Sequence, residues 1–162
     1  MPSTWFTTLS ITTAVLALSG CAVQSVQPGT PQAEVVARYG QPGRVVPLPT
    51  GSRLQYSLQP MGQSAVMVDL DANGRVTSAR EVLNAASFAR VVPGQWTRAT
   101  AEAEFGRPAS IDHVMSWQGD IMAYRWLDIN QSMFFWLYLD ANQVVQRVGQ
   151  GMELPTLDKD PN

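Results

Sequence analysis

The chain of 162 residues has one cysteine and one histidine, and this scarcity excludes several kinds of site. One cysteine forms no disulfide within the chain, and His113 has no second histidine or thiolate to complete a zinc site. Glu102 and Glu104 are two positions apart on a predicted helix and do not face each other. No serine has the Gly-x-Ser-x-Gly spacing of a nucleophile elbow. We therefore expect a non-enzymatic protein with no catalytic residue, no metal and no cofactor.

Charge is sparse as well, and it is nearly balanced. The 11 basic and 13 acidic residues give a net charge of −2, and charged residues make up 15% of the chain. Such a composition lacks the basic surface that nucleic-acid binding requires. We expect no nucleic-acid partner.

Residues 1–20 contain no charge at all and lead directly to the one cysteine. The apolar run from Leu9 to Leu18 fits the core of a secretory signal and is shorter than the ~20 residues of a membrane-spanning helix. It lacks the basic residues that usually open such a signal. Leu18-Ser-Gly-Cys21 resembles the lipobox of bacterial lipoproteins. The alternative is an ordinary N-terminal helix with a buried Cys21.

The lipobox resemblance implies cleavage before Cys21, a diacylglyceryl thioether on its sulfur and acylation of the new amino terminus. Several acyl chains, at about 0.8 kcal/mol for each buried methylene, anchor a protein stably in a membrane. Ala22 follows the cysteine where an aspartate would favour the inner membrane. The resemblance therefore implies a lipid-anchored protein of the outer membrane that faces the periplasm.

Two stretches of the remaining sequence follow the same pattern. Residues 28–42 (PGTPQAEVVARYGQP) correspond to residues 93–108 (PGQWTRATAEAEFGRP) with one residue inserted. Further along, LDANGRV at 70–76 corresponds to LDANQVV at 139–145. Agreement at both ends of the two stretches indicates an internal duplication.

Each copy predicts the same elements in the same order. A threonine opens a short helical segment and a glycine with a proline behind it closes the segment, from Thr30 to Gly40 and from Thr97 to Gly106. Alternating segments follow each helix and predict three antiparallel strands. They are 53–59, 64–71 and 75–83 in the first copy, and 121–128, 131–140 and 143–149 in the second. The predicted fold class is α+β: two tandem repeats, each a short helical segment followed by a three-stranded antiparallel meander, with helices on one face of the sheet.

These features divide the chain into five predicted parts. They are a lipoprotein signal peptide at 1–20, a lipidated tether at 21–27, a first repeat at 28–84, a second repeat at 85–152 and a flexible tail at 153–162.

The helix, its Gly-x-Pro end, the tyrosine-containing strand and the Asp-x-x-Gly hairpin together resemble a family of small outer-membrane lipoproteins. This family includes the E subunit of the β-barrel assembly machine, and the resemblance covers residues 26–150. Two such units in tandem also resemble the fold of the β-lactamase inhibitor protein. The resemblance implies assembly or maintenance of the envelope through contact with a periplasmic or outer-membrane protein. The alternative function is inhibition of a periplasmic hydrolase.

Comparison of the two copies separates the faces of each predicted sheet, because side chains alternate along a strand. Positions that are apolar in both copies mark the face covered by helices: Leu54, Tyr56 and Leu58 with Met122, Tyr124 and Trp126, and Val66, Val68 and Leu70 with Phe135, Leu137 and Leu139. On the opposite face, Ala65, Met67 and Asp69 align with Phe134, Trp136 and Tyr138.

Phe134, Trp136 and Tyr138 form an aromatic row on that opposite face. Three such side chains offer ~450–750 Å², which reaches the largest apolar patch that a soluble monomer usually exposes. The row either packs against the other repeat or a loop, or receives a partner protein, or reflects a register slipped by one residue. Trp96 and Trp117 lie near predicted loops and either extend the same surface or fill the core.

The segment Asp69-Leu-Asp71-Ala-Asn73-Gly74 also matches the start of a calcium-binding loop. The twelfth position, however, is Arg80 where such a loop has glutamate, and the second copy reads Asp-Ala-Asn-Gln. We therefore expect a hairpin turn at this segment and no metal site.

Overall fold

The structure is a computed structural model, and it describes residues 26–154. The first half of this part contains α1 (Gln32–Tyr39), β1 (Arg44–Leu48), β2 (Gly51–Ser57), β3 (Ala65–Asp71) and β4 (Val76–Glu81). The second half contains α2 (Ala85–Phe88), α3 (Arg98–Phe105), β5 (Ser110–Val114), β6 (Trp117–Asp128), β7 (Gln131–Leu139) and β8 (Val145–Met152). The strands form two four-stranded antiparallel sheets, in the orders β1-β2-β3-β4 and β5-β6-β7-β8. The α+β class is confirmed.

The prediction of three strands in each half is wrong, because β1 and β5 add a fourth strand to each sheet. Both are five-residue edge strands, and every residue of β5 is exposed. A strand with no buried face shows no alternation of apolar and polar residues, so its sequence carries no strand signal. In β1 the signal is weakened further by Pro47, which sheets tolerate at an edge.

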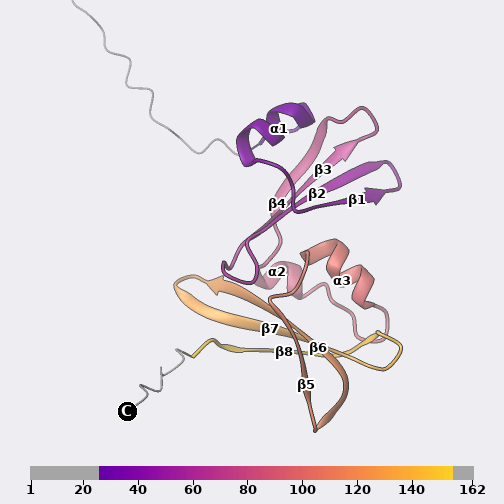
Figure 1. Cartoon of the computed structure of the whole chain (residues 1–162), viewed down its shortest axis with the longest axis vertical. Coiled ribbons are helices and arrows are strands. Elements are labelled where there is room, and N and C mark those ends of the chain that lie inside the picture. Colours follow the sequence, from indigo (N-terminus) through magenta and orange to yellow (C-terminus); the bar gives the residue numbers. More distant parts are fainter. Residues whose placement is uncertain (1–25, 155–162) are drawn as a thin grey trace, which may run out of the picture.

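The helices form layers with the two sheets. Figure 1 shows α2 and α3 between the sheets, and α1 on the outer side of the first sheet. Val35 of α1 packs on Leu54 and Leu70, whereas Phe105 of α3 packs on Tyr124 and other apolar residues of the second sheet. The prediction of helices on one face of the sheet is therefore wrong for the first sheet, which has α1 on one face and α3 on the other.

The predicted helix ends at glycine are confirmed in both halves. Gly40 and Gly106 follow α1 and α3 with φ values of 79° and 82°, a region of backbone space that favours glycine. The amide of Gly40 donates to the carbonyl of Val36, and that of Gly106 donates to the carbonyl of Glu102. At the start of α3, the Thr97 side chain accepts a hydrogen bond from the amide of Thr100.

The two Asp-Ala-Asn segments form hairpin turns, as predicted. Asp71 Oδ1 accepts hydrogen bonds from the backbone amides two and four residues further on, at 2.8 and 2.9 Å. Asp140 Oδ1 accepts the equivalent bonds at 2.9 and 3.0 Å. Because these carboxylates satisfy the turn, the segment has a structural role that does not require a metal. No cluster of three or more metal-binding side chains occurs among residues 26–154.

Most of the predicted core residues are buried, with one clear exception. Leu54, Tyr124 and Phe135 are among the largest fully buried side chains. Leu58 was expected beside them but is 63% exposed, because β2 ends at Ser57 and the chain then enters a loop.

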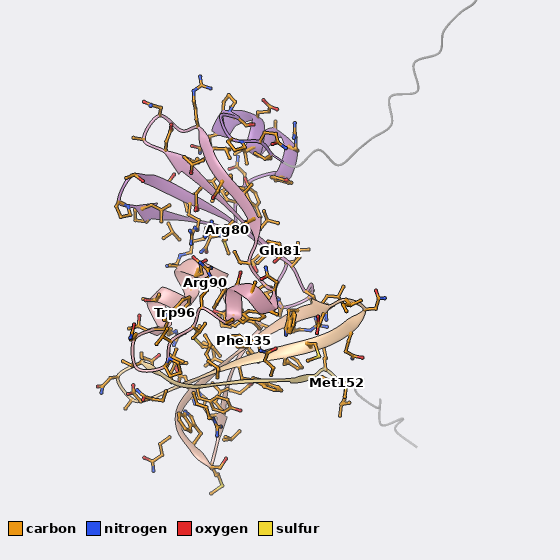
Figure 2. All side chains as sticks on the ribbon, turned by 180° about the vertical axis from the view of Figure 1, so that it is seen from behind. Arg80, Glu81, Arg90, Trp96, Phe135 and Met152 are labelled. Carbon is orange, nitrogen blue, oxygen red and sulfur yellow. The ribbon has the colours of Figure 1, made fainter. Side chains whose placement is uncertain are left out.

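The first sheet contacts α3 through the buried Ala65 and Met67 of β3 and through a cluster of polar side chains. Arg53 donates to Asp69 at 2.6 and 3.0 Å and to Glu104 of α3 at 2.6 Å. Arg80 and Arg90 bind the same Glu104 carboxylate. Figure 2 shows Arg80 and Arg90 at the boundary between the two sheets. This cluster joins the two halves into one body.

Candidate functional site on the second sheet

The face of the second sheet that points away from α2 and α3 carries the predicted aromatic row. Phe135 and Leu137 of β7 are buried on the helix side, whereas Phe134, Trp136 and Tyr138 are half-buried on the opposite side. The register is therefore as predicted, and the reading of a slipped register is wrong. The two sheets meet through α3 on the other side of β7, so the row does not pack between the halves.

Strands β6 and β8 frame the aromatic row on either side. Tyr138, Trp136 and Phe134 are paired in register with Ile121, Ala123 and Arg125 of β6 and with Arg147, Gly149 and Gly151 of β8. Ile121 and Ala123 are buried on the strand beside the rings. Arg125 is held at the end of the row by Glu153, at 2.8 Å.

Trp117 of β6 extends the row, in agreement with one of the two readings of this residue. Its ring meets Tyr138 at a centroid distance of 5.4 Å and an angle of 75°. Its Nε1 donates to the carbonyl of Leu139 at 2.8 Å, which fixes the indole. Phe134 and Trp136 stack at 5.6 Å and 21°. We call the surface made by Trp117, Phe134, Trp136 and Tyr138 the aromatic face.

Arg147 supplies a positive charge at one end of the aromatic face. Its guanidinium carbon lies 3.8 Å from the ring centroid of Tyr138 and 5.2 Å from that of Trp117. These are cation–π distances, so the guanidinium rests against both rings. Within the part of the chain that the structure describes, no carboxylate pairs with Arg147. Its hydrogen-bond donors are therefore available to an acidic group from outside.

Two glycines of β8 make room for the largest ring of the aromatic face. A Cβ atom at Gly151 would lie 2.9 Å from Cη2 of Trp136, and one at Gly149 would lie 3.6 Å from Cε3 of the same ring. The indole of Trp136 therefore lies across β8, over the space that the missing side chains leave. Glycine weakens the interior of a strand. The close approach of the Trp136 ring explains why β8 nevertheless contains two glycines.

The prediction that Trp96 belongs to the same surface is wrong. Trp96 stacks on Phe105 of α3 with a centroid distance of 5.5 Å and packs against the core between α3 and the second sheet. Figure 2 shows Trp96 with Phe135 on the side of the sheet that faces the helices. Nearness to a predicted loop does not decide which face a side chain occupies, and this caused the error.

Sequence reasoning missed Arg147, Gly149 and Gly151 as parts of the site. A signal existed, because these residues alternate along the strand that follows the aromatic row. The predicted strand stopped at 149, whereas β8 continues to Met152. Arg147 and Gly149 already lay in the predicted strand, on the aromatic side by alternation, and the correct strand end adds Gly151.

Two further residues singled out from the sequence are Cys21 and His113. Cys21, the predicted lipidation residue, lies outside the described residues. His113 is exposed, with Nδ1 3.5 Å from Asp120.

A cavity of about 570 Å³ lies between α3, β5 and the loop after β2, with Arg98, Glu102 and Arg107 in its lining. Among residues 26–154, no helix has the length and apolar character needed to cross a membrane.

Comparison with known proteins identifies no family. No family model matches the chain, and no curated protein matches it. Among solved structures, the chain is similar to a DUF4309 family protein (YjgB) from Bacillus subtilis subsp. subtilis str. 168. The identity is 15%, the match covers 76% of this chain and 79% of that chain, and the TM-score is 0.33. A likeness at this level assigns no function.

Proposed function

We propose that this chain is a lipoprotein of the outer membrane, anchored through Cys21, that faces the periplasm and binds another envelope protein with its aromatic face. It performs no catalysis and needs no cofactor. The observation that carries the proposal is the aromatic face itself, which is a row of four half-buried rings on a sheet face that no helix of residues 26–154 covers. Aromatic and arginine side chains are the residues most enriched at the energetic centres of protein interfaces.

The rings are held in place before any partner binds. Trp117 is fixed by its hydrogen bond to Leu139, Trp136 lies against two glycines, and Tyr138 lies beneath Arg147. Side chains that are already ordered lose little conformational entropy on association. A partner therefore gains the contact of these rings at small entropic cost.

We further propose that the two halves are copies of one unit. In each half a tyrosine hydroxyl donates to the carbonyl of the glycine that ends the helix, from Tyr56 to Gly40 at 3.2 Å and from Tyr124 to Gly106 at 3.0 Å. The matching face of the first sheet is covered by α3, whereas no described helix lies over the aromatic face of the second sheet. The binding role then belongs to the second copy alone.

Cross-linking in intact envelopes tests the binding role. A tagged chain should yield a cross-linked protein partner, and Trp136→Ala should lower its recovery by roughly thirty-fold, which corresponds to ~2 kcal/mol at ~1.4 kcal/mol for each factor of ten. Val45→Ala is the matched control, because Val45 is an exposed apolar residue of β1 on the first sheet. Equal recovery with wild type and Trp136→Ala would refute the role of the aromatic face. Recovery of outer-membrane assembly proteins would favour the assembly role, and recovery of one soluble hydrolase would favour inhibition.

Mass spectrometry tests the anchor separately. The wild-type chain should begin at Cys21 and carry acyl chains, whereas Cys21→Ser should remain an unlipidated precursor. A wild-type chain with a free thiol at Cys21 and an intact N-terminus would refute the localisation without affecting the aromatic face.

A further inference from the structure

One edge of β8 has no strand beside it in the part of the chain that the structure describes. The amide of Glu153 donates to the carbonyl of Ser132 at 2.9 Å, and this bond sets the alternation along the β7–β8 pair. Hydrogen-bonded pairs occur at every second residue of an antiparallel ladder, so the backbone groups of residues 151, 149 and 147 also bond to β7. The backbone groups of Val148, Gln150 and Met152 therefore point to the open edge.

The linker before α3 covers only the first residue of this edge. The amide of Val145 donates to the carbonyl of Trp96 at 2.8 Å, and the amide of Gly94 donates to the carbonyl of Val145 at 2.7 Å. No described backbone segment pairs with β8 beyond that point. Figure 2 shows Met152 at the far end of the strand, away from this linker.

Two other edge strands, β1 and β5, carry features that discourage pairing with another chain. β1 contains Pro47, and β5 has a register irregularity between Asp112 and Val114. Proline and bulges are common means of protecting a sheet edge. From Val148 to Met152, β8 has no proline, no charged residue and no register shift. It is therefore an open pairing edge of the second sheet.

Apolar side chains lie along this edge on both faces of the sheet, with Gln150 between Val148 and Met152 on one of them. The Trp136 indole reaches over Gly149 and Gly151 on the aromatic side. Val148 and Met152 are 38% and 60% exposed on the other side. An added strand would bury all three side chains in addition to making backbone hydrogen bonds.

We infer that β8 accepts an extended segment of the partner protein as a fifth strand of the second sheet. This inference rests on the proposed function and specifies how the partner is held. The segment bonds to the backbone of Val148, Gln150 and Met152, as in other cases of strand addition. Its residues opposite Gly149 and Gly151 are apolar and pack on the edge of Trp136.

A second copy of this chain is a poorer occupant of the edge. In an antiparallel self-pairing centred on Gln150, Gly149 of each copy faces Gly151 of the other. That arrangement supplies no side chain to fill the space beside Trp136. A partner segment with bulky apolar residues at alternate positions fills it.

The test uses the full chain and a displayed library of random ten-residue peptides. Peptides enriched on the wild type should have apolar residues at alternate positions. Gln150→Pro removes the outward amide of residue 150 without removing a bond to β7, and should weaken their binding by roughly tenfold or more. Gln150→Ala is the matched control, because it removes the same side chain and keeps the amide, and its binding should stay within about twofold of wild type.

A second measurement does not depend on the folding of the proline variant. An enriched peptide is N-methylated at its odd-numbered residues in one form and at its even-numbered residues in another. One of these two forms lacks the amides that donate to β8, and that form should not bind the wild type. The inference would be overturned if the library yielded no enriched peptide. It would also be overturned if the enriched peptides bound Gln150→Pro as well as the wild type and both of their N-methylated forms still bound the wild type. Concentration-dependent dimerisation that Gln150→Pro removes would also overturn it, because the occupant would then be a second copy. If Trp136→Ala abolishes partner cross-linking while Gln150→Pro does not, the inference fails and the proposed function stands.

Discussion

Nη1 of Arg53 lies 2.6 Å from Oε2 of Glu104, and this contact joins a strand of the first sheet to the helix that packs on the second. Arg53 is only 8% exposed and also holds Asp69 through two hydrogen bonds. Beside it, Gln55 donates to the carbonyls of Glu102 and Ala103, near the C-terminal end of α3. The boundary between the halves therefore combines a hydrogen-bonded polar cluster with the buried apolar side chains of Ala65 and Met67. Such a boundary holds two sheets at a fixed angle as long as every partner is present.

The first prediction concerns the removal of one of these partners. Glu104→Gln leaves the buried Arg53 with one carboxylate in place of two, and the loss of a charged hydrogen-bond partner costs about 1.5–3 kcal/mol. Urea denaturation should show this loss in the free energy of unfolding. Glu34→Gln is the matched control, because Glu34 forms an exposed pair with Arg38 within α1, a type worth about 0.5 kcal/mol. Equal losses in the two variants would contradict the structural role of Glu104.

The second prediction follows from the pKa values of the same cluster. Burial raises the pKa of Asp69 and Glu104, but the hydrogen bonds from the surrounding arginines outweigh it, so the pKa of each carboxyl lies below its ordinary value. A lowered pKa in the folded state contributes stability that is present above the unfolded pKa, at about 4, and is lost as the pH falls through the folded value. The free energy of unfolding should therefore be level above about pH 5 and should fall below about pH 4.

Denaturation curves at pH 7, 5, 4 and 3 measure this dependence. Glu104→Gln should show a shallower decline than wild type, because one of the two titrating carboxyls is absent. An unchanged slope in this variant would show that other groups cause the acid sensitivity.

The third prediction concerns Gly151 and Trp136. A Cβ at Gly151 would lie 2.9 Å from Cη2 of Trp136, so Gly151→Ala should displace the indole from β8. The Trp136 ring is half-buried, and Cη2 lies at its outer end. The free energy of unfolding should therefore change by less than about 1 kcal/mol. Partner recovery should fall as in Trp136→Ala. Gly43→Ala, where the new Cβ meets only Gln55 O at 3.7 Å, is the control and should leave recovery unchanged.

Local signals predicted the parts of this fold that local interactions determine. Gly40 and Gly106 end helices through backbone conformations that glycine favours, and Asp71 and Asp140 close hairpins through bonds to their own turns. Alternation along a strand located the aromatic face for the same reason, because it depends on neighbours in sequence.

Tertiary contacts determine the parts that the sequence did not predict. The position of α3 between the sheets depends on the bonds of Arg53 and Gln55 to a helix some fifty residues away. The placement of Trp96 depends on its stacking with Phe105, and no local pattern distinguishes that position from the aromatic face. The edge strands β1 and β5 were missed because exposed strands lack the alternation that reveals a buried one.

The last prediction compares Phe135 and Trp136, which are adjacent in sequence and lie on opposite faces of β7. Phe135 is 1% exposed and stacks on Phe88 at a centroid distance of 4.0 Å, so Phe135→Ala should cost about 3–5 kcal/mol. Trp136 is half-buried on the aromatic face, and its removal leaves an open surface where Phe135→Ala would leave a closed cavity. Trp136→Ala should therefore cost about half as much or less.

Thermal melts of the two purified variants measure the difference, and partner recovery is measured on the same samples. Trp136→Ala should melt clearly above Phe135→Ala and lose the partner. A melting temperature as low as that of Phe135→Ala would mean that the indole supports the fold, and the loss of the partner would then follow from unfolding. In that case the aromatic face would have no demonstrated role in binding. A small change in melting temperature together with a large loss of recovery is the combination that only a binding surface produces.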